Sequence, residues 1–76
     1  MEKQTLNNIS LGKTVTISNL SCNLATKRRL LDLGIISTAQ ITPVLKSSIG
    51  DLVAYEIRNN IIALRSEDTK LIEVIV

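Results

Sequence analysis

Apolar and polar residues alternate along several short stretches of the chain, which is the pattern of half-buried strands. In the first stretch, Val15 and Ile17 are each followed by a polar residue. The pattern predicts five strands, over Thr14–Asn19, Gln40–Leu45, Val53–Arg58, Ile61–Arg65 and Leu71–Val76. Because short strands leave exposed edges unless the sheet closes, we expect a mainly β fold, a small five-stranded barrel rather than a flat sheet.

Polar residues between these stretches predict how the strands are joined. Asn59-Asn60 is expected to form a tight hairpin, since asparagine tolerates a positive φ. Pro43 removes a backbone donor, which predicts a sheet edge or a bulge there. The polar segment Ser66–Lys70 predicts one turn of helix with Ser66 as its cap.

A helical spacing of leucines predicts one longer helix, inserted after the first strand at about Leu24–Leu33. Asn23 is a suitable N-cap, and Gly34 can take the left-handed conformation that ends a helix. The expected core side holds Leu24, Leu30, Leu31 and Leu33, and the opposite side holds Ala25, Arg28, Arg29 and Asp32. We therefore expect Leu30, Leu31 and Leu33 to pack on the strands.

Three basic residues, Lys27, Arg28 and Arg29, precede the central leucines of this helix. Arg28 and Arg29 stand four and three residues before Asp32, close enough for weak surface pairing. Two interpretations stay open: the run is the solvated side of an amphipathic helix, or it is a handle for a partner.

Size and composition limit the class of protein. The chain has 76 residues, 45% of them hydrophobic, which favours one globular domain over residues 1–76. Nine Lys and Arg against seven Asp and Glu give a net charge of only +2. Cys22 is the only cysteine, and the N-terminal residues lack the apolar region of a signal peptide. We expect a cytoplasmic protein without a membrane-inserted segment.

Catalytic and metal-binding chemistry has few candidate residues in this sequence. The chain has no histidine, no second cysteine and no glycine-rich phosphate loop. Cys22 has no histidine that could activate it as a nucleophile. We therefore expect no enzyme activity, no resident metal and no cofactor.

Nucleic-acid binding is a weaker alternative for a small barrel. Such proteins usually stack bases on aromatic side chains along a basic groove. Tyr55 is the only aromatic residue, and its alternation places it with Val53 and Ile57 on the core side. No nucleic-acid partner is expected.

The order of the motifs resembles the FeoA family, small cytoplasmic partners of the bacterial ferrous iron transporter FeoB. RRLLDLGI is followed by a strand, then by IGD, then by YEIR, NN and IIALR, and the chain closes with IEVIV. The resemblance covers about Leu11–Val76. The chain departs from the family pattern at Ser37-Thr38, Pro43, Ser48, Leu52 and Asn59.

This resemblance implies an SH3-like barrel with the helix inserted after the first strand. It implies a binding role, association with FeoB at the cytoplasmic face of the membrane in support or regulation of ferrous iron uptake, and no catalysis. An alternative is an SH3-like interaction module of another system, since the same module resembles the C-terminal domain of iron-dependent repressors. Weak self-association is left open.

Three places are candidates for contact with the partner. The loop Ile49-Gly50-Asp51 either only connects two strands or offers Ile49 as an apolar anchor. Arg65 either extends at the barrel rim or contacts the partner. The helix offers its charged side, and the full candidate set is Arg28, Arg29, Asp32, Ile49, Gly50, Asp51 and Arg65.

Overall fold

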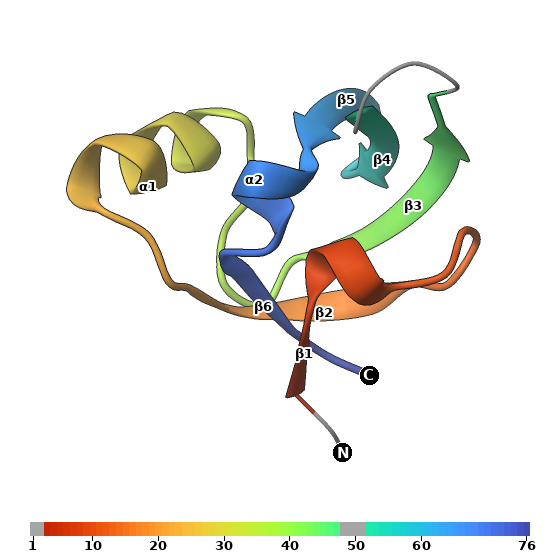
Figure 1. Ribbon diagram of the computed structural model, residues 1–76, viewed down its shortest axis with the longest axis horizontal. Coiled ribbons are helices and arrows are strands. Elements are labelled where there is room, and N and C mark those ends of the chain that lie inside the picture. The colour runs from red at the N-terminus through yellow and green to blue at the C-terminus, as the bar shows by residue number, and fades with distance from the viewer. Residues whose placement is uncertain (1–2, 48–51) are drawn as a thin grey trace.

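Antiparallel strands form one continuous sheet, which bends round on itself (Figure 1). The structure is a computed structural model that describes residues 3–47 and 52–76. Within these residues, six strands pair in the order β1-β6-β2-β3-β4-β5. The strands are β1 (Lys3–Thr5), β2 (Val15–Leu20), β3 (Gln40–Lys46), β4 (Leu52–Ile57), β5 (Asn60–Arg65) and β6 (Ile72–Ile75). The helices are a short 3-10 helix η1 (Leu6–Asn8), α1 (Leu24–Asp32) and α2 (Ser66–Thr69).

The sheet bends at two places where its register shifts. In β3 the shift lies between Pro43 and Leu45, and in β2 it lies between Ile17 and Asn19. Bulges of this kind bend a strand and increase its twist. As a result, β3 runs from the layer of β1, β6 and β2 to the layer of β4 and β5, and η1 and α2 lie between the two layers (Figure 1). The bulge predicted at Pro43 is confirmed.

The core lies inside this bent sheet and is built mostly from strand residues, to which Ile35 and Ala39 are added by the segment between α1 and β3. Tyr55, the largest buried side chain, is 2% exposed. Helical segments add only Leu6 from η1 and Leu30 from α1 to the apolar core. The remaining buried apolar residues of the described ranges are Val15, Ile17, Leu20, Ile35, Ala39, Ile41, Pro43, Ile57, Leu64, Ile72 and Val74.

The prediction of a mainly β, SH3-like small barrel with one inserted helix is confirmed. The structure adds one strand to the predicted five, because β1 pairs with β6 over Lys3–Thr5. This segment is polar in sequence and carries no alternating apolar signal. Its place in the sheet depends on backbone hydrogen bonds at the edge rather than on burial of its side chains.

The helix is where it was predicted, but its predicted core side is wrong. Asn23 caps α1, since its Oδ1 accepts from Thr26 N at 2.8 Å, and Gly34 has a φ of +92°. Leu30 is fully buried, whereas the other three predicted core leucines are exposed. Their exposed fractions are 73% for Leu24, 43% for Leu31 and 42% for Leu33. α1 lies beside the sheet rather than across it, and strand residues fill the interior, so there is room for one helix side chain only (Figure 1).

Two local details also differ from the sequence predictions. The β4–β5 turn is Arg58-Asn59, with φ values of +51° and +68°, and not Asn59-Asn60. Continuous pairing from Leu52 to Ile57 makes Ile57 face Asn60, which forces the two residues between them into the turn. The N-cap of α2 is Arg65 rather than Ser66, which is already the first helical residue.

Candidate partner-binding surface

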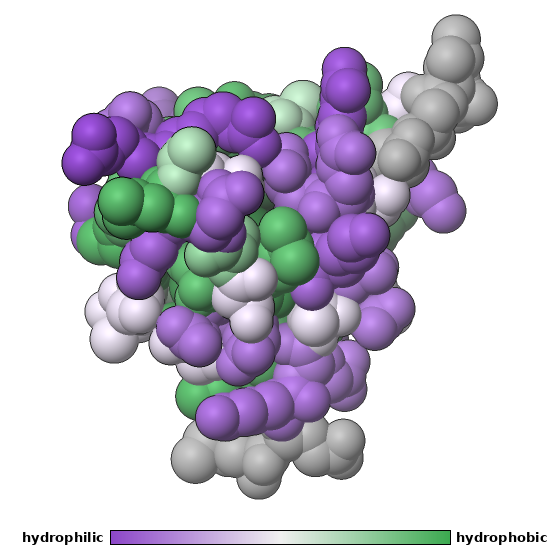
Figure 2. Space-filling model, turned by 60° about the vertical axis from the view of Figure 1, so that its left-hand side comes forward, coloured by the Kyte–Doolittle hydropathy of each residue, from purple (hydrophilic) through white to green (hydrophobic). Residues whose placement is uncertain are grey.

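The side of α1 that faces away from the sheet carries leucines next to a cation. Leu24, Arg28 and Leu31 have the i, i+4, i+7 spacing of one helix face, and all three are exposed. We call these three residues the outer α1 surface. Figure 2, which brings the left-hand side of Figure 1 forward, shows apolar areas at the surface among hydrophilic side chains. Exposed apolar groups at helical spacing are typical of a helix that contacts another molecule.

A groove of about 440 Å³ lies on another side of α1, between that helix, β5 and α2. Leu33 and Leu52 are its large exposed apolar residues, at 42% and 39%. We call it the α1–β5 groove, and it is lined by Arg29, Leu33, Leu52, Ala63, Leu64, Arg65, Glu67 and Asp68. Apolar and charged groups are therefore mixed along it.

Both arginines of the groove have an acidic neighbour on α2. Arg29 Nη2 donates to Asp68 Oδ1 at 2.9 Å, and Arg65 Nη1 lies 3.8 Å from Glu67 Oε1. The Asp68 side chain is only 19% exposed, whereas those of Arg65 and Glu67 are 68% and 66% exposed. The first pair is thus the better defined, and it ties α1 to α2.

This geometry corrects one prediction and divides the candidate residues between two places. Arg29 pairs with Asp68 and not with Asp32, which is exposed on α1. The structure brings Arg29 and Arg65 together in the α1–β5 groove and leaves Arg28 on the outer α1 surface. The candidates Ile49, Gly50 and Asp51 lie outside the described residues.

Sequence reasoning missed the exposed leucines and the two acidic residues of α2. The nine residues of α1 and its C-cap hold four leucines. A short helix beside a barrel buries only a narrow stripe of side chains, so not all four can be in the core. That excess of leucine was the available signal. No sequence pattern predicts the pairing of Asp68 with Arg29, because the two residues are 39 positions apart and meet only in the folded chain.

Few of the described side chains are candidates for metal binding or catalysis. In residues 3–47 and 52–76, no group of three or more His, Cys, Asp or Glu side chains lies close enough to hold a metal ion. Cys22 is half-buried and packs against the core. The ring of Tyr55 is buried, so it cannot stack on a base at the surface.

The described part of the chain also contains no candidate for a membrane-spanning helix. No helix there is both long enough and apolar enough to cross a bilayer.

The fold and its exposed surfaces define an SH3-like β-barrel domain with an inserted helix. The FeoA domain family model matches residues 4–76, so the chain belongs to the FeoA family. The NMR structure of a FeoA-like protein from Clostridium acetobutylicum is 25% identical, with a TM-score of 0.89, and the match covers 100% of this chain and 88% of that one. Comparison with curated proteins gives no match.

Two further solved structures share the fold. Stenotrophomonas maltophilia FeoA was crystallised with zinc and described as a procaryotic SH3 domain protein and a candidate activating factor of ferrous iron transport. It is 24% identical, with a TM-score of 0.81 over 95% of this chain and 89% of that one. A manganese-dependent transcriptional repressor in complex with manganese is 17% identical, with a TM-score of 0.88 over 99% of this chain and 37% of that one.

Proposed function

We propose that this protein is a non-catalytic accessory factor of ferrous iron uptake that acts by binding the FeoB transporter at the cytoplasmic face of the membrane. The observation that carries the proposal is the match of the FeoA domain model to residues 4–76. Membership of that family supports a role in ferrous iron transport. The zinc-bound relative, described as a candidate activating factor of this transport, supports an accessory rather than a catalytic role.

The outer α1 surface is the part of the described chain best suited to such contact. Leu24 and Leu31 offer apolar area at helical spacing, and Arg28 adds a charge that forms no ion pair with another residue of the ranges 3–47 and 52–76. An apolar centre beside a charge is the usual arrangement of a protein interface, in which the apolar groups hold the complex and the charge speeds encounter. The loop Ile49–Asp51 stays a second candidate for contact.

The test is direct binding of the purified chain to FeoB in detergent, with rates measured at several salt concentrations. Arg28→Glu should slow association, and the defect should shrink as salt is raised. Arg58→Glu, at the exposed β4–β5 turn, is the matched control and should bind as the parent does. Arg29 is unsuitable for this test, because its replacement by Glu would face Asp68.

The apolar part of the surface is tested through dissociation. Leu24→Asp should speed dissociation, since an anchor lost from a desolvated contact acts mainly on the off-rate. Ile61→Asp is the control, because Ile61 is 62% exposed but lies on β5. Ile49→Asp tests the loop in the same way. Retention of FeoB by the parent and by all of these variants would place the contact elsewhere, and failure of the parent to bind would overturn the proposal.

The second candidate function is that of an SH3-like interaction module in another system. The repressor structure favours it, because there a domain of this fold occupies about a third of a longer chain. Under this alternative the groove of an SH3-like barrel docks a proline-rich or other peptide segment. A chain that does not bind FeoB but retains such a peptide would support it.

A further inference from the structure

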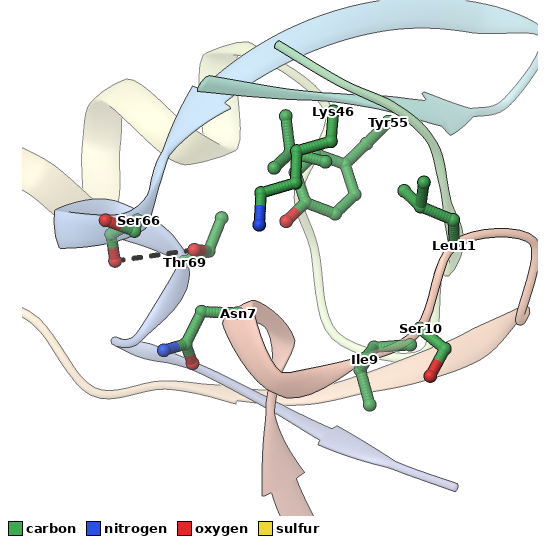
Figure 3. Close-up of a pocket in the computed structure, with 9 residues that line it drawn as sticks. Asn7, Ile9, Ser10, Leu11, Lys46, Tyr55, Ser66 and Thr69 are labelled. Carbon is green, nitrogen blue, oxygen red and sulfur yellow. Dashed lines mark hydrogen bonds between the residues drawn. The ribbon is translucent and has the colours of Figure 1, made fainter. Parts of the chain in front are cut away.

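A cavity of about 430 Å³ lies on the side of α2 away from the α1–β5 groove. The residues of α2 divide between the two hollows: Ser66 and Thr69 line the cavity, whereas Glu67 and Asp68 line the groove. The other walls come from η1 and the segment after it, from the end of β3, and from β4 (Figure 3). The cavity is thus assembled from the N-terminal segment, the β3–β4 pair and α2.

One part of its wall is apolar. Ile9 and Val53 are partly buried and pack against the core, and Leu11 is 54% exposed at the rim. These side chains can cover a short hydrocarbon group. Pockets for small ligands usually measure about 300–1,000 Å³, so the cavity belongs at the lower end of that range.

Polar groups converge on the other part of the wall. Figure 3 shows the amino group of Lys46 and the hydroxyl of Tyr55 turned into the cavity, with the Thr69 hydroxyl across from them. Among the described residues that line it, Lys46 is the one charged group, and none is acidic. The cavity therefore favours a ligand with a negative charge.

Tyr55 is suited to donate a hydrogen bond into this space. Burial raises the pKa of its hydroxyl above the ordinary value, and a hydrogen bond with Thr69 lowers the pKa in part. Thr69 donates its own hydroxyl proton to Ser66 O at 3.4 Å, so its oxygen is left to accept from the Tyr55 hydroxyl. A carboxylate is a stronger acceptor than a hydroxyl, so a bound carboxylate can accept the hydrogen bond of Tyr55 in place of Thr69.

We propose that this cavity binds a carboxylate that carries a short apolar group. Lys46 pairs with the carboxylate, the Tyr55 hydroxyl donates to one of its oxygens, and Ile9, Leu11 and Val53 cover the hydrocarbon. Two sources supply this chemistry: a free small acid, and the C-terminal carboxylate of a peptide that ends in an apolar residue. The proposal is independent of FeoB binding, because it uses none of the residues of the outer α1 surface.

The experiment is a two-dimensional NMR titration of the full chain with isocaproate, with isocaproamide as the uncharged control. Isocaproate should shift the amides of residues that line the cavity, and the amide should not. Lys46→Gln should weaken isocaproate about tenfold, the loss typical of one charge-assisted hydrogen bond. Lys27→Gln, an exposed lysine on α1, is the matched control and should leave the affinity unchanged.

Further arms separate the roles of Tyr55 and of the two sources. Tyr55→Phe keeps the ring in the core and should weaken isocaproate several-fold, with unchanged strand amide shifts showing that the fold is intact. An acetylated tripeptide ending in leucine, with a free or an amidated C-terminus, tests the peptide source. Binding of isocaproate indicates that the natural ligand is a small acid. Binding of the peptide with a free C-terminus, without binding of isocaproate, indicates a peptide ligand.

Three results would overturn the proposal. The first is that neither isocaproate nor the peptide shifts the amides of cavity residues at millimolar concentration. The second is that isocaproate and isocaproamide bind with equal affinity. The third is that the Lys46→Gln variant binds the ligand with the affinity of the parent.

Discussion

The sheet and α1 differ in how their apolar residues are used. In β6 every second residue is buried, and in β2 the alternation of Val15 and Ile17 is interrupted by the register shift before Leu20, which is again buried. In the nine residues of α1 only Leu30 is buried, although leucine also stands at positions 24 and 31. Many side chains of the sheet contribute to the buried core, whereas α1 contributes one.

This difference shows how a small domain can fold while some of its apolar residues stay at the surface. An isolated helix of nine residues is marginal in water, so α1 needs its fixed ends and its tertiary anchors. The Asn23 cap, the Leu30 side chain and the Arg29–Asp68 pair supply them. With the helix held in this way, Leu24 and Leu31 are not needed for the core.

The largest expected effect separates Leu30 from its neighbour. Leu30→Ala should reduce the free energy of unfolding by about 2–5 kcal/mol, because it leaves a cavity where the only buried side chain of α1 stood. Leu31→Ala is the matched control, and we expect a loss below about 1 kcal/mol from a side chain that is 43% exposed. Chemical denaturation measures both.

Hydrogen exchange on Leu30→Ala sharpens this prediction. The amides of α1 should lose more protection than those of β2 and β6, because Leu30 is the one buried side chain that holds the helix to the core. Equal losses for Leu30→Ala and Leu31→Ala would contradict the assignment of a single anchor.

The next effect concerns the start of the helix. Asn23→Ala should cost about 1 kcal/mol, since it removes the acceptor for Thr26 N. Ser21→Ala, at an exposed position before the cap, should change the unfolding free energy by less than about 0.5 kcal/mol. Thermal unfolding of both variants provides the measurement, and an equal drop in melting temperature would rule out a specific role of the cap.

A stabilising change is expected where the chain returns from α1 to the sheet. Thr38 has a φ of +72°, which is unfavourable for a β-branched residue, and its N–H donates to Ile17 O at 2.8 Å. Thr38→Gly keeps that hydrogen bond and should raise the free energy of unfolding by about 0.5–1 kcal/mol. Asn59→Gly, with a φ of +68°, should gain less, because asparagine tolerates this region. A loss of stability in Thr38→Gly would show that the strain is not stored there.

The smallest effect tests the link between α1 and α2. Asp68→Asn should cost about 0.5 kcal/mol at low salt, because the Arg29 side chain is 60% exposed and the pair is largely screened. The difference from the parent should shrink at high salt. Glu67→Gln, which affects the longer contact with Arg65, is the control and should have no measurable effect. A salt-independent loss at Asp68 would indicate packing rather than charge.

Features that depend on near neighbours were predictable from the sequence. The alternation of β2 and β6, the Asn23 cap and the left-handed Gly34 follow from residue properties within a few positions. The helix was placed within one residue of its observed end for the same reason. The resemblance to the FeoA family rested on motifs in order along the chain, and the family model covers them.

Features that depend on residues far apart in the chain needed the tertiary structure. Helical spacing alone could not tell Leu30 from Leu31, because the choice depends on how much of the barrel interior the strands already fill. Arg29 and Asp68 meet although they are 39 positions apart in the chain. Lys46 and Tyr55 meet because β3 pairs with β4, and α2 adds Thr69 to the same cavity. The sequence therefore determined five of the six strands, α1 and its cap. The packing of the layers decided which side chains remain at the surface.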